Sequence, residues 1–150
     1  MHRSRAAQVS VPLRWRDLDY QGHVYHGVML TLLDEGRTKF FGGHMGLERP
    51  DAYVVVRIEL DYLAETLHSN GPLGIDFEIV RLGRTSLITR ETVTDALGSR
   101  VAAALTTSVL WDQEAGAPRA ILDEERRIAA AYMVADAGDA NRANGWDALR

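Results

Sequence analysis

The sequence contains no cysteine, which excludes disulfides, zinc sites built from thiolates and cysteine nucleophiles. It also lacks any apolar stretch approaching the roughly 18 consecutive residues that a membrane-spanning helix needs. The N-terminal stretch 1–10 carries Arg3 and Arg5 but no apolar run behind them, so we expect no signal peptide. Together these absences favour a soluble, cytoplasmic protein without a membrane partner.

Long blocks of like charge are absent as well. The formal net charge of the 150 residues is -4, and charged side chains of both signs are spread along the chain. This balance argues against a nucleic-acid partner, although it leaves room for a local basic patch that binds a phosphorylated ligand. With 46% hydrophobic residues, the chain is sufficient for one domain with a core of its own.

In the first third of the chain, apolar residues recur first at every second position and then at helical spacing. From Val9 to Trp15 apolar and polar residues alternate, which predicts a half-buried strand. Pro12 removes a backbone donor from this strand and so predicts a position at a sheet edge, or a bulge. Apolar residues then recur at helical spacing, which predicts a helix over about 26–41 that ends at the Gly42-Gly43 pair.

The rest of the chain predicts a sheet and a second helix. Alternating apolar residues indicate strands over 54–62, 75–79, 86–94 and 101–111, joined by short turns. Connections this short make neighbouring strands antiparallel. Acidic residues at its start indicate a helix over about 123–134. The composition of 136–150 indicates a poorly ordered tail.

The order of these elements predicts an α+β fold, a curved antiparallel β-sheet wrapped around one long central α-helix. Gly27 and Gly36 lie inside that helix although glycine lowers helix propensity. We therefore expect a close approach between the helix and the sheet at these positions. We assign residues 1–135 to this single domain.

The segment 16–26 is the richest in reactive side chains, and it lies where the first strand gives way to the helix. It contains Asp17, Asp19, His23 and His26 within a few residues of Gly22. The first N–H groups of a helix lack internal partners and favour negative charge. A thioester carbonyl at that position would have its developing oxyanion stabilised, and a nearby carboxylate could act as nucleophile or general base. The segment therefore predicts acyl-transfer chemistry.

The run Asp19-Tyr20-Gln21-Gly22-His23-Val24-Tyr25, followed by His26, resembles the motif of the hotdog thioesterases related to 4-hydroxybenzoyl-CoA thioesterase and to the Tol-Pal-associated acyl-CoA thioesterases. The strand 54–63 and the turn 81–86 also look like that family, and the resemblance extends over about residues 9–130. It implies a hotdog fold and hydrolysis of an acyl thioester to free acid and thiol. It further implies a homodimer, or a homotetramer built as a dimer of dimers, with no cofactor besides the coenzyme A of the substrate.

The resemblance also implies roles for particular residues. Asp19 matches the catalytic carboxylate, acting as nucleophile or general base. The backbone N–H of His26 matches the donor that polarises the thioester carbonyl, and its side chain matches a histidine near the site. We add His23 to the candidate catalytic residues. Substrate binding is assigned to the companion acid Asp17, to Tyr25 and to the turn that approaches coenzyme A in several relatives, Gly83, Arg84, Thr85 and Ser86.

Several alternatives stay open at this point. The triplet Gly22-His23-Val24 is similar to the branch acting on long acyl chains, in which an Asn usually replaces His26, so acyl length and the choice between coenzyme A and acyl-carrier protein are not fixed. A hotdog hydratase or dehydratase and a non-catalytic acyl-thioester binder are the alternative functions. The two acids and two histidines suit zinc or iron by type. Their spacing matches no metal motif, so we expect no metal site.

Overall fold

The fold is built from one long helix and a five-stranded antiparallel sheet that continues into a short hairpin. The computed structural model describes residues 7–49 and 51–134. The elements in chain order are β1 (Ala7–Val11), α1 (His26–Gly43), β2 (Tyr53–Tyr62), β3 (Leu73–Leu82), β4 (Ser86–Thr94), β5 (Arg100–Asp112), β6 (Ala117–Pro118) and α2 (Asp123–Ala130). Two 3-10 turns accompany them, η1 (Trp15–Asp17) and η2 (His68–Asn70). The strand order is β1-β3-β4-β5-β2, with β6 paired to β5.

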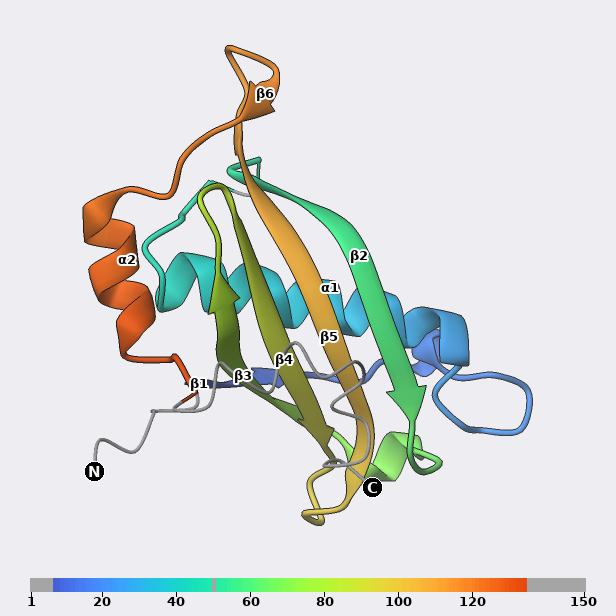
Figure 1. Ribbon diagram of the computed structural model, residues 1–150. Helices are drawn as coiled ribbons and strands as arrows, with labels where there is room; N and C mark the ends of the chain where they lie inside the picture. Colours follow the sequence, from blue (N-terminus) through green and yellow to red (C-terminus); the bar gives the residue numbers. More distant parts are fainter. Residues whose placement is uncertain (1–6, 50, 135–150) are drawn as a thin grey trace.

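The sheet curves across α1, as Figure 1 shows, and the core lies between them. The helix buries one face, formed by Met29, Leu32, Leu33, Gly36, Arg37, Phe40 and Phe41. The ring of Phe40 stacks on that of Phe77 from β3, with centroids 4.8 Å apart. The predicted fold class, an antiparallel sheet wrapped around a central helix, is therefore confirmed.

The two glycines inside α1 have different neighbours. At Gly36 a Cβ atom would lie 2.7 Å from Cδ1 of Ile75, so the predicted close approach of the sheet is present there. At Gly27 the added atom would instead meet the ring of Tyr25, at 2.8 Å. The expectation of sheet contact at Gly27 was wrong, because the side chain of Tyr25, two residues earlier, occupies this position.

A charged pair lies buried between α1 and the sheet. The guanidinium of Arg37 donates to both carboxylate oxygens of Glu91, at 3.0 and 2.9 Å, and to the hydroxyl of Thr106 at 3.2 Å. The hydroxyl of Thr89 donates to Glu91 at 3.1 Å. Burial raises the pKa of the Glu91 carboxyl, against the opposing effect of Arg37 and the hydroxyls. The pair fixes α1 across β4 and β5.

Several predicted boundaries need correction. The first strand ends at Val11, four residues before Trp15, because the chain turns into η1. Its edge position agrees with the presence of Pro12, since among the described strands β1 pairs only with β3. The helix α1 continues through Gly42 and Gly43, which we expected to stop it. Neither the 3-10 turns nor β6 was predicted.

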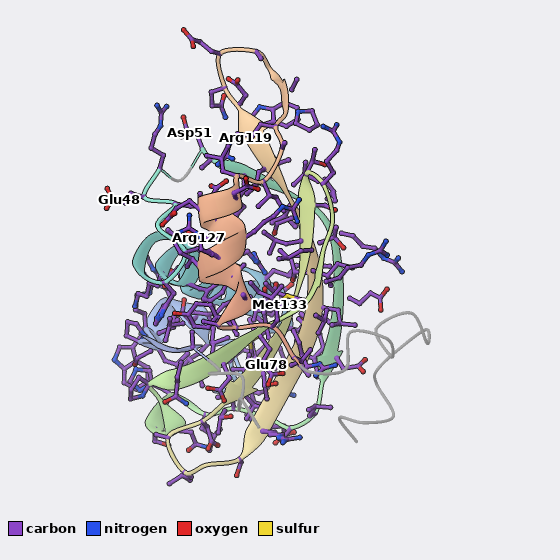
Figure 2. The ribbon with its side chains drawn as sticks, turned by 60° about the vertical axis from the view of Figure 1, so that its left-hand side comes forward. Glu48, Asp51, Glu78, Arg119, Arg127 and Met133 are labelled. Carbon is purple, nitrogen blue, oxygen red and sulfur yellow. The ribbon has the colours of Figure 1, made fainter. Side chains whose placement is uncertain are left out.

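The second helix is shorter than expected, because it ends at Ala130 rather than near residue 134. Beyond it the chain joins the sheet, where the N–H of Ile79 donates to Tyr132 and the N–H of Val134 donates to Ile79. In Figure 2 Met133 lies just beyond the last turn of α2, beside the sheet. The predicted tail 136–150 falls outside the described residues, and the domain assignment 1–135 stays a prediction.

The strand β2 forms the other edge of the sheet. Its outer edge pairs with no strand of residues 7–49 and 51–134. We expected one buried face, yet Val55, Val56 and Tyr62 are exposed, and Tyr53, Val54, Ile58 and Leu60 are only half-buried. None of the helices within these ranges is long and apolar enough to cross a membrane.

Candidate active site

Asp19 lies in a tight loop between η1 and α1. Its Oδ1 accepts hydrogen bonds from the backbone N–H groups of Gln21, at 2.8 Å, and of His23, at 3.1 Å. The loop closes through the N–H of Asp19, which donates to the carbonyl of His23 at 2.8 Å. Gly22 has a φ of 82°, a conformation that a side chain would strain. One carboxylate oxygen is thus held in place, while Oδ2 has no hydrogen-bond partner in the described part of the chain.

The helix α1 begins at His26 with its first amides free. Neither the His26 nor the Gly27 N–H has an acceptor among residues 7–49 and 51–134, as expected for a helix start without a side-chain cap. The hydroxyl of Tyr62, at the end of β2, donates to the carbonyl of His26. The two rings also meet edge to face, with centroids 6.4 Å apart. The helix start is therefore tied to the sheet while its N–H groups stay available to a ligand.

A cavity of about 390 Å³ brings Asp19, His23 and His26 together. Its remaining lining comes from Val24, Met29, Tyr62, Leu63, Ala64, Glu65 and Thr66. The acidic side chain and the polar end of the helix thus line one space, with apolar atoms of Met29 and Leu63 beside them. This arrangement suits a polarised carbonyl next to an apolar group.

Glu65 and Tyr62 are among the lining residues that were not foreseen from the sequence. Glu65 follows β2, and its Oε2 lies 3.4 Å from Nε2 of His23. No local pattern predicts this pairing, because it depends on how the loop after β2 packs against the loop before α1. Tyr62 could have been found, since the alternation of β2 places it on the same face as Ile58 and Leu60.

None of the six predicted substrate-binding residues lines this cavity, and Asp17 and Tyr25 lie beside it. Asp17 is only 5% exposed, and its Oδ2 accepts from the backbone N–H of Arg14 at 2.8 Å. Its carbonyl accepts from the N–H of Tyr25 at 2.9 Å. Tyr25 is itself exposed and places its ring 4.4 Å from that of His26. Asp17 and Tyr25 therefore support the loop and the helix start from behind.

The turn Gly83–Ser86 lies at the opposite end of the sheet. In the sheet, Ser86 is paired with Val109 of β5, and Val109 is paired with Val54 of β2. The turn is therefore level with the start of β2, whereas the cavity adjoins Tyr62, the last residue of β2. Figure 1 shows the β3–β4 turn at the upper end of the sheet and η2 at the lower end. The turn packs against α2, where Arg126 donates to the carbonyl of Gly83 at 2.8 Å. A single chain does not bring Gly83, Arg84, Thr85 and Ser86 together with Asp19.

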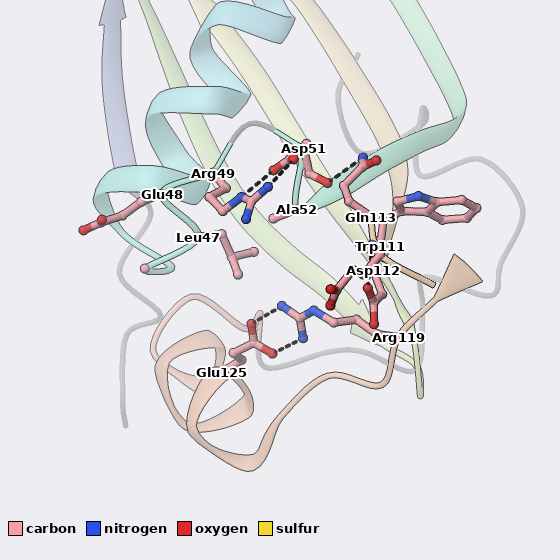
Figure 3. Close-up of a pocket in the computed structure, with 12 residues that line it drawn as sticks. Leu47, Glu48, Arg49, Asp51, Ala52, Trp111, Asp112, Gln113, Arg119 and Glu125 are labelled. Carbon is pink, nitrogen blue, oxygen red and sulfur yellow. Dashed lines mark hydrogen bonds and ion pairs between the residues drawn. The ribbon is translucent and has the colours of Figure 1, made fainter. Parts of the chain in front are cut away.

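A larger cavity, about 820 Å³, occupies that upper end (Figure 3). Its prominent charges are paired with one another. Arg119 donates to both oxygens of Glu125, at 2.7 Å each, and this ion pair holds the pKa of the Glu125 carboxyl below its usual value. Arg49 pairs in the same way with Asp51. Because these groups satisfy each other, we place the chemistry at the smaller cavity.

A metal centre would need several ligating side chains in one place. Within the described ranges no three His, Cys, Asp or Glu residues gather closely enough to hold an ion. The four residues considered as ligands from the sequence are divided, because Asp17 is turned toward Arg14 and away from the cavity lining.

The curled sheet, the central helix and the cavity at the helix start define a hotdog-fold protein of the thioesterase type. A family model described as the thioesterase superfamily matches residues 21–102, more than half of the chain. The chain therefore belongs to the thioesterase superfamily. The matched range starts two residues after Asp19, so it does not cover the candidate carboxylate.

Solved structures share this fold. A thioesterase from Thermus thermophilus, complexed with coenzyme A and zinc, is 30% identical, with 83% of this chain and 92% of that one covered and a TM-score of 0.73. A predicted thioesterase from Bacillus stearothermophilus is 22% identical, with coverage of 85% and 96% and a TM-score of 0.74. A hypothetical protein from Staphylococcus aureus in complex with coenzyme A is 13% identical, with coverage of 86% and 84% and a TM-score of 0.72. A search of curated proteins finds no match.

Proposed function

We propose that this chain is an acyl-CoA thioesterase that uses Asp19 as its reactive carboxylate. The observation that carries the proposal is the shared cavity, lined by the Asp19 carboxylate and by the start of α1, where the N–H groups of His26 and Gly27 lack acceptors within the described residues. A thioester carbonyl oxygen can accept from those amides while its carbon faces Asp19. Helix-terminal donors of this kind stabilise the negative charge that develops on the oxygen.

Two routes complete the hydrolysis. In one, Asp19 removes a proton from water, the water oxygen bonds to the carbonyl carbon, and the C–S bond breaks to release a thiolate that takes up the proton. In the other, a carboxylate oxygen of Asp19 bonds to the carbonyl carbon and expels the thiolate, and water then hydrolyses the resulting anhydride. A single turnover in labelled water tests the second route, because label enters Asp19 only when water attacks the Asp19 carbonyl of the anhydride.

Coenzyme A is the carrier that we favour over acyl-carrier protein. The Thermus thermophilus protein, which shares 30% identity with this chain, was solved with coenzyme A bound. The cavity is small and lies beside an apolar helix face, which suits the acyl end of such a thioester. Parallel assays with acyl-CoA and acyl-carrier protein bearing the same acyl group test the choice.

We further propose a homodimer formed through β2, with a dimer of dimers as the larger alternative. The outer edge of β2 is unpaired among the described residues and presents Val56 at 58% exposure. Two copies related by a two-fold axis would pair their β2 strands antiparallel. The start of one β2 then lies beside the end of the other, so the Gly83–Ser86 turn of the second copy approaches the Asp19 cavity of the first. A sedimentation measurement of the wild type and Val56→Lys tests this, and a monomeric wild type would overturn it.

Thiol release from a panel of aliphatic and aryl acyl-CoA substrates tests the function itself. We expect Asp19→Ala to lower kcat by at least about a hundredfold, the usual scale for a lost general base. Asp112→Ala is the matched control, because Oδ1 of Asp112 also accepts from two turn amides, those of Glu114 at 2.9 Å and Ala115 at 3.0 Å. Equal hydrolysis by wild type and Asp19→Ala would refute the assignment of Asp19. Hydration of an enoyl thioester without thiol release would instead support the hydratase alternative, and binding without either reaction the non-catalytic one.

A further inference from the structure

We propose that Trp15 and His68 form a stacking platform for the adenine ring of the coenzyme A substrate, with Arg16 facing its phosphates. This inference rests on the proposed function and assigns a site for the nucleotide end of the substrate. It concerns residues that take no part in the chemistry at Asp19.

The platform consists of two rings from separate 3-10 turns. Trp15 in η1 and His68 in η2 stack with centroids 4.3 Å apart and an interplanar angle of 7°. Trp15 nevertheless keeps 77% of its surface exposed. One face of the indole is therefore held by the imidazole while its other face is open to solvent. A ring fixed in this way binds a second flat ring without first having to be ordered.

The platform continues directly from the cavity lining. The cavity is lined by the segment from Tyr62 to Thr66, and the next two residues are Leu67 and His68. Leu67 forms a β-bridge with His23, which lines the same cavity, and the N–H of Val24 donates to the carbonyl of Thr66 at 2.8 Å. A substrate with its thioester at the helix start can thus extend along this segment toward Trp15.

The charge beside the platform fits a nucleotide. Arg16 follows Trp15, is exposed and forms no ion pair within residues 7–49 and 51–134. Its neighbour Arg14 is already engaged by Glu35 and Asp17. Coenzyme A carries a purine and several phosphates at the end remote from the thiol. Aromatic rings bind bases by stacking, and an unpaired guanidinium binds phosphate oxygens, so the two groups together match that end of the molecule.

The turn Gly83–Ser86, which the family resemblance suggests for coenzyme A, is the alternative site for the nucleotide. The platform and the turn lie at opposite ends of the sheet in one chain, and the two sites lead to different predictions. If Trp15 receives the adenine, removing its ring weakens the binding of any ligand that carries the nucleotide. A substrate that ends at the pantetheine arm does not reach the platform and is unaffected.

The test compares Trp15→Ala with wild type on an acyl-CoA and on the matching acyl-pantetheine. We expect KM for the acyl-CoA to rise at least about fivefold, the effect of one lost base–aromatic stack, with kcat unchanged. We expect KM for the acyl-pantetheine to stay the same. Leu97→Ala is the matched control, because Leu97 is a surface side chain of similar exposure, 78%, in the β4–β5 hairpin. Arg16→Gln should raise KM for the acyl-CoA in the same selective way.

Three kinetic results would overturn the platform. KM could be unchanged for both substrates, it could rise equally for both, or the selective rise could appear in Arg84→Ala and not in Trp15→Ala. A change in the sedimenting mass of Trp15→Ala would also overturn it, because it would indicate a protein contact at this surface. Calorimetric titration of coenzyme A into the Asp19→Ala background keeps the test independent of catalysis. If the wild type hydrolyses no substrate but binds coenzyme A more tightly than Trp15→Ala does, the proposed function is refuted. The platform is supported in that case.

Discussion

The hydroxyl of Tyr62, the last residue of β2, donates a hydrogen bond to the carbonyl of His26, the first residue of α1. This contact joins an edge of the sheet to the end of the helix where the free amides lie. Burial raises the pKa of the Tyr62 hydroxyl, which favours the protonated form that donates this bond. We infer that Tyr62 is a positioning residue, which orients the helix start without contacting the reacting atoms.

Replacing Tyr62 by phenylalanine should therefore affect turnover more than substrate affinity. We expect Tyr62→Phe to lower kcat by about fivefold, because losing one hydrogen bond of roughly 1 kcal/mol loosens the amides that hold the oxyanion. KM should change little. Tyr53→Phe is the control, since the Tyr53 hydroxyl lies 3.5 Å from Thr38 of α1 at the other end of the same strand. Comparable losses of kcat in both variants would show a general loosening of the helix.

The buried pair of Arg37 and Glu91 makes a sharper prediction about stability. Glu91→Gln leaves the guanidinium buried beside a neutral amide, and we expect it to cost about 3 kcal/mol of unfolding free energy. Glu78→Gln on the neighbouring strand removes the partner of Arg90 from a half-exposed pair 3.3 Å apart, and should cost less than about 1 kcal/mol. Urea unfolding measures both. The joint variant Arg37→Met/Glu91→Leu should recover part of the loss, and an additive loss would contradict the explanation.

Gly36 tests how closely the helix approaches the sheet. Because a Cβ atom at this position would lie 2.7 Å from Cδ1 of Ile75, Gly36→Ala should destabilise the fold by about 2 kcal/mol despite its better helix propensity. Removing that methyl group in Gly36→Ala/Ile75→Val should restore part of the stability. Gly43→Ala, where no atom lies within 4 Å of the added carbon, is the control and should be neutral or stabilising. Thermal unfolding of the four proteins decides the matter.

The pair of Arg119 and Glu125 predicts a pH dependence of stability. Arg119 lowers the pKa of the Glu125 carboxyl below its value in the unfolded chain. The pair therefore stabilises the fold above the ordinary carboxyl pKa, and this contribution is lost as the pH falls through the lowered pKa of the folded state. Glu125→Gln should cost about 1 kcal/mol near neutral pH, and the difference from wild type should shrink below about pH 4. A difference that stays constant in urea titrations down to that pH would argue against the pair, and Glu124→Gln, an exposed neighbour, provides the comparison.

Short-range patterns account for most of the fold. Alternation and helical spacing located the long helix and the main strands, and Pro12 indicated the edge position of β1, because each signal depends on neighbours along the chain. The end of β1 was wrong for the opposite reason. Trp15 continues the alternation, yet the chain turns away at Pro12 and the indole stacks on His68 from a distant loop.

The lining of the candidate site was predictable in part. Asp19, His23 and His26 lie close together in the sequence, so a loop leading into a helix start was sufficient to expect them around one space. Glu65 was out of reach, since its proximity to His23 depends on tertiary packing. Arg37 was not singled out from the sequence, because no sequence pattern reveals that Glu91 lies opposite it on β4.

The burial of Arg37 and Glu91 also constrains how this protein can change over time. Losing either charge alone leaves the other enclosed without a counter-ion, so we expect a single substitution to cost more stability than a joint exchange for apolar residues. The two positions, 54 residues apart, therefore act as one unit of the core, and we expect tolerated changes there to involve both residues together.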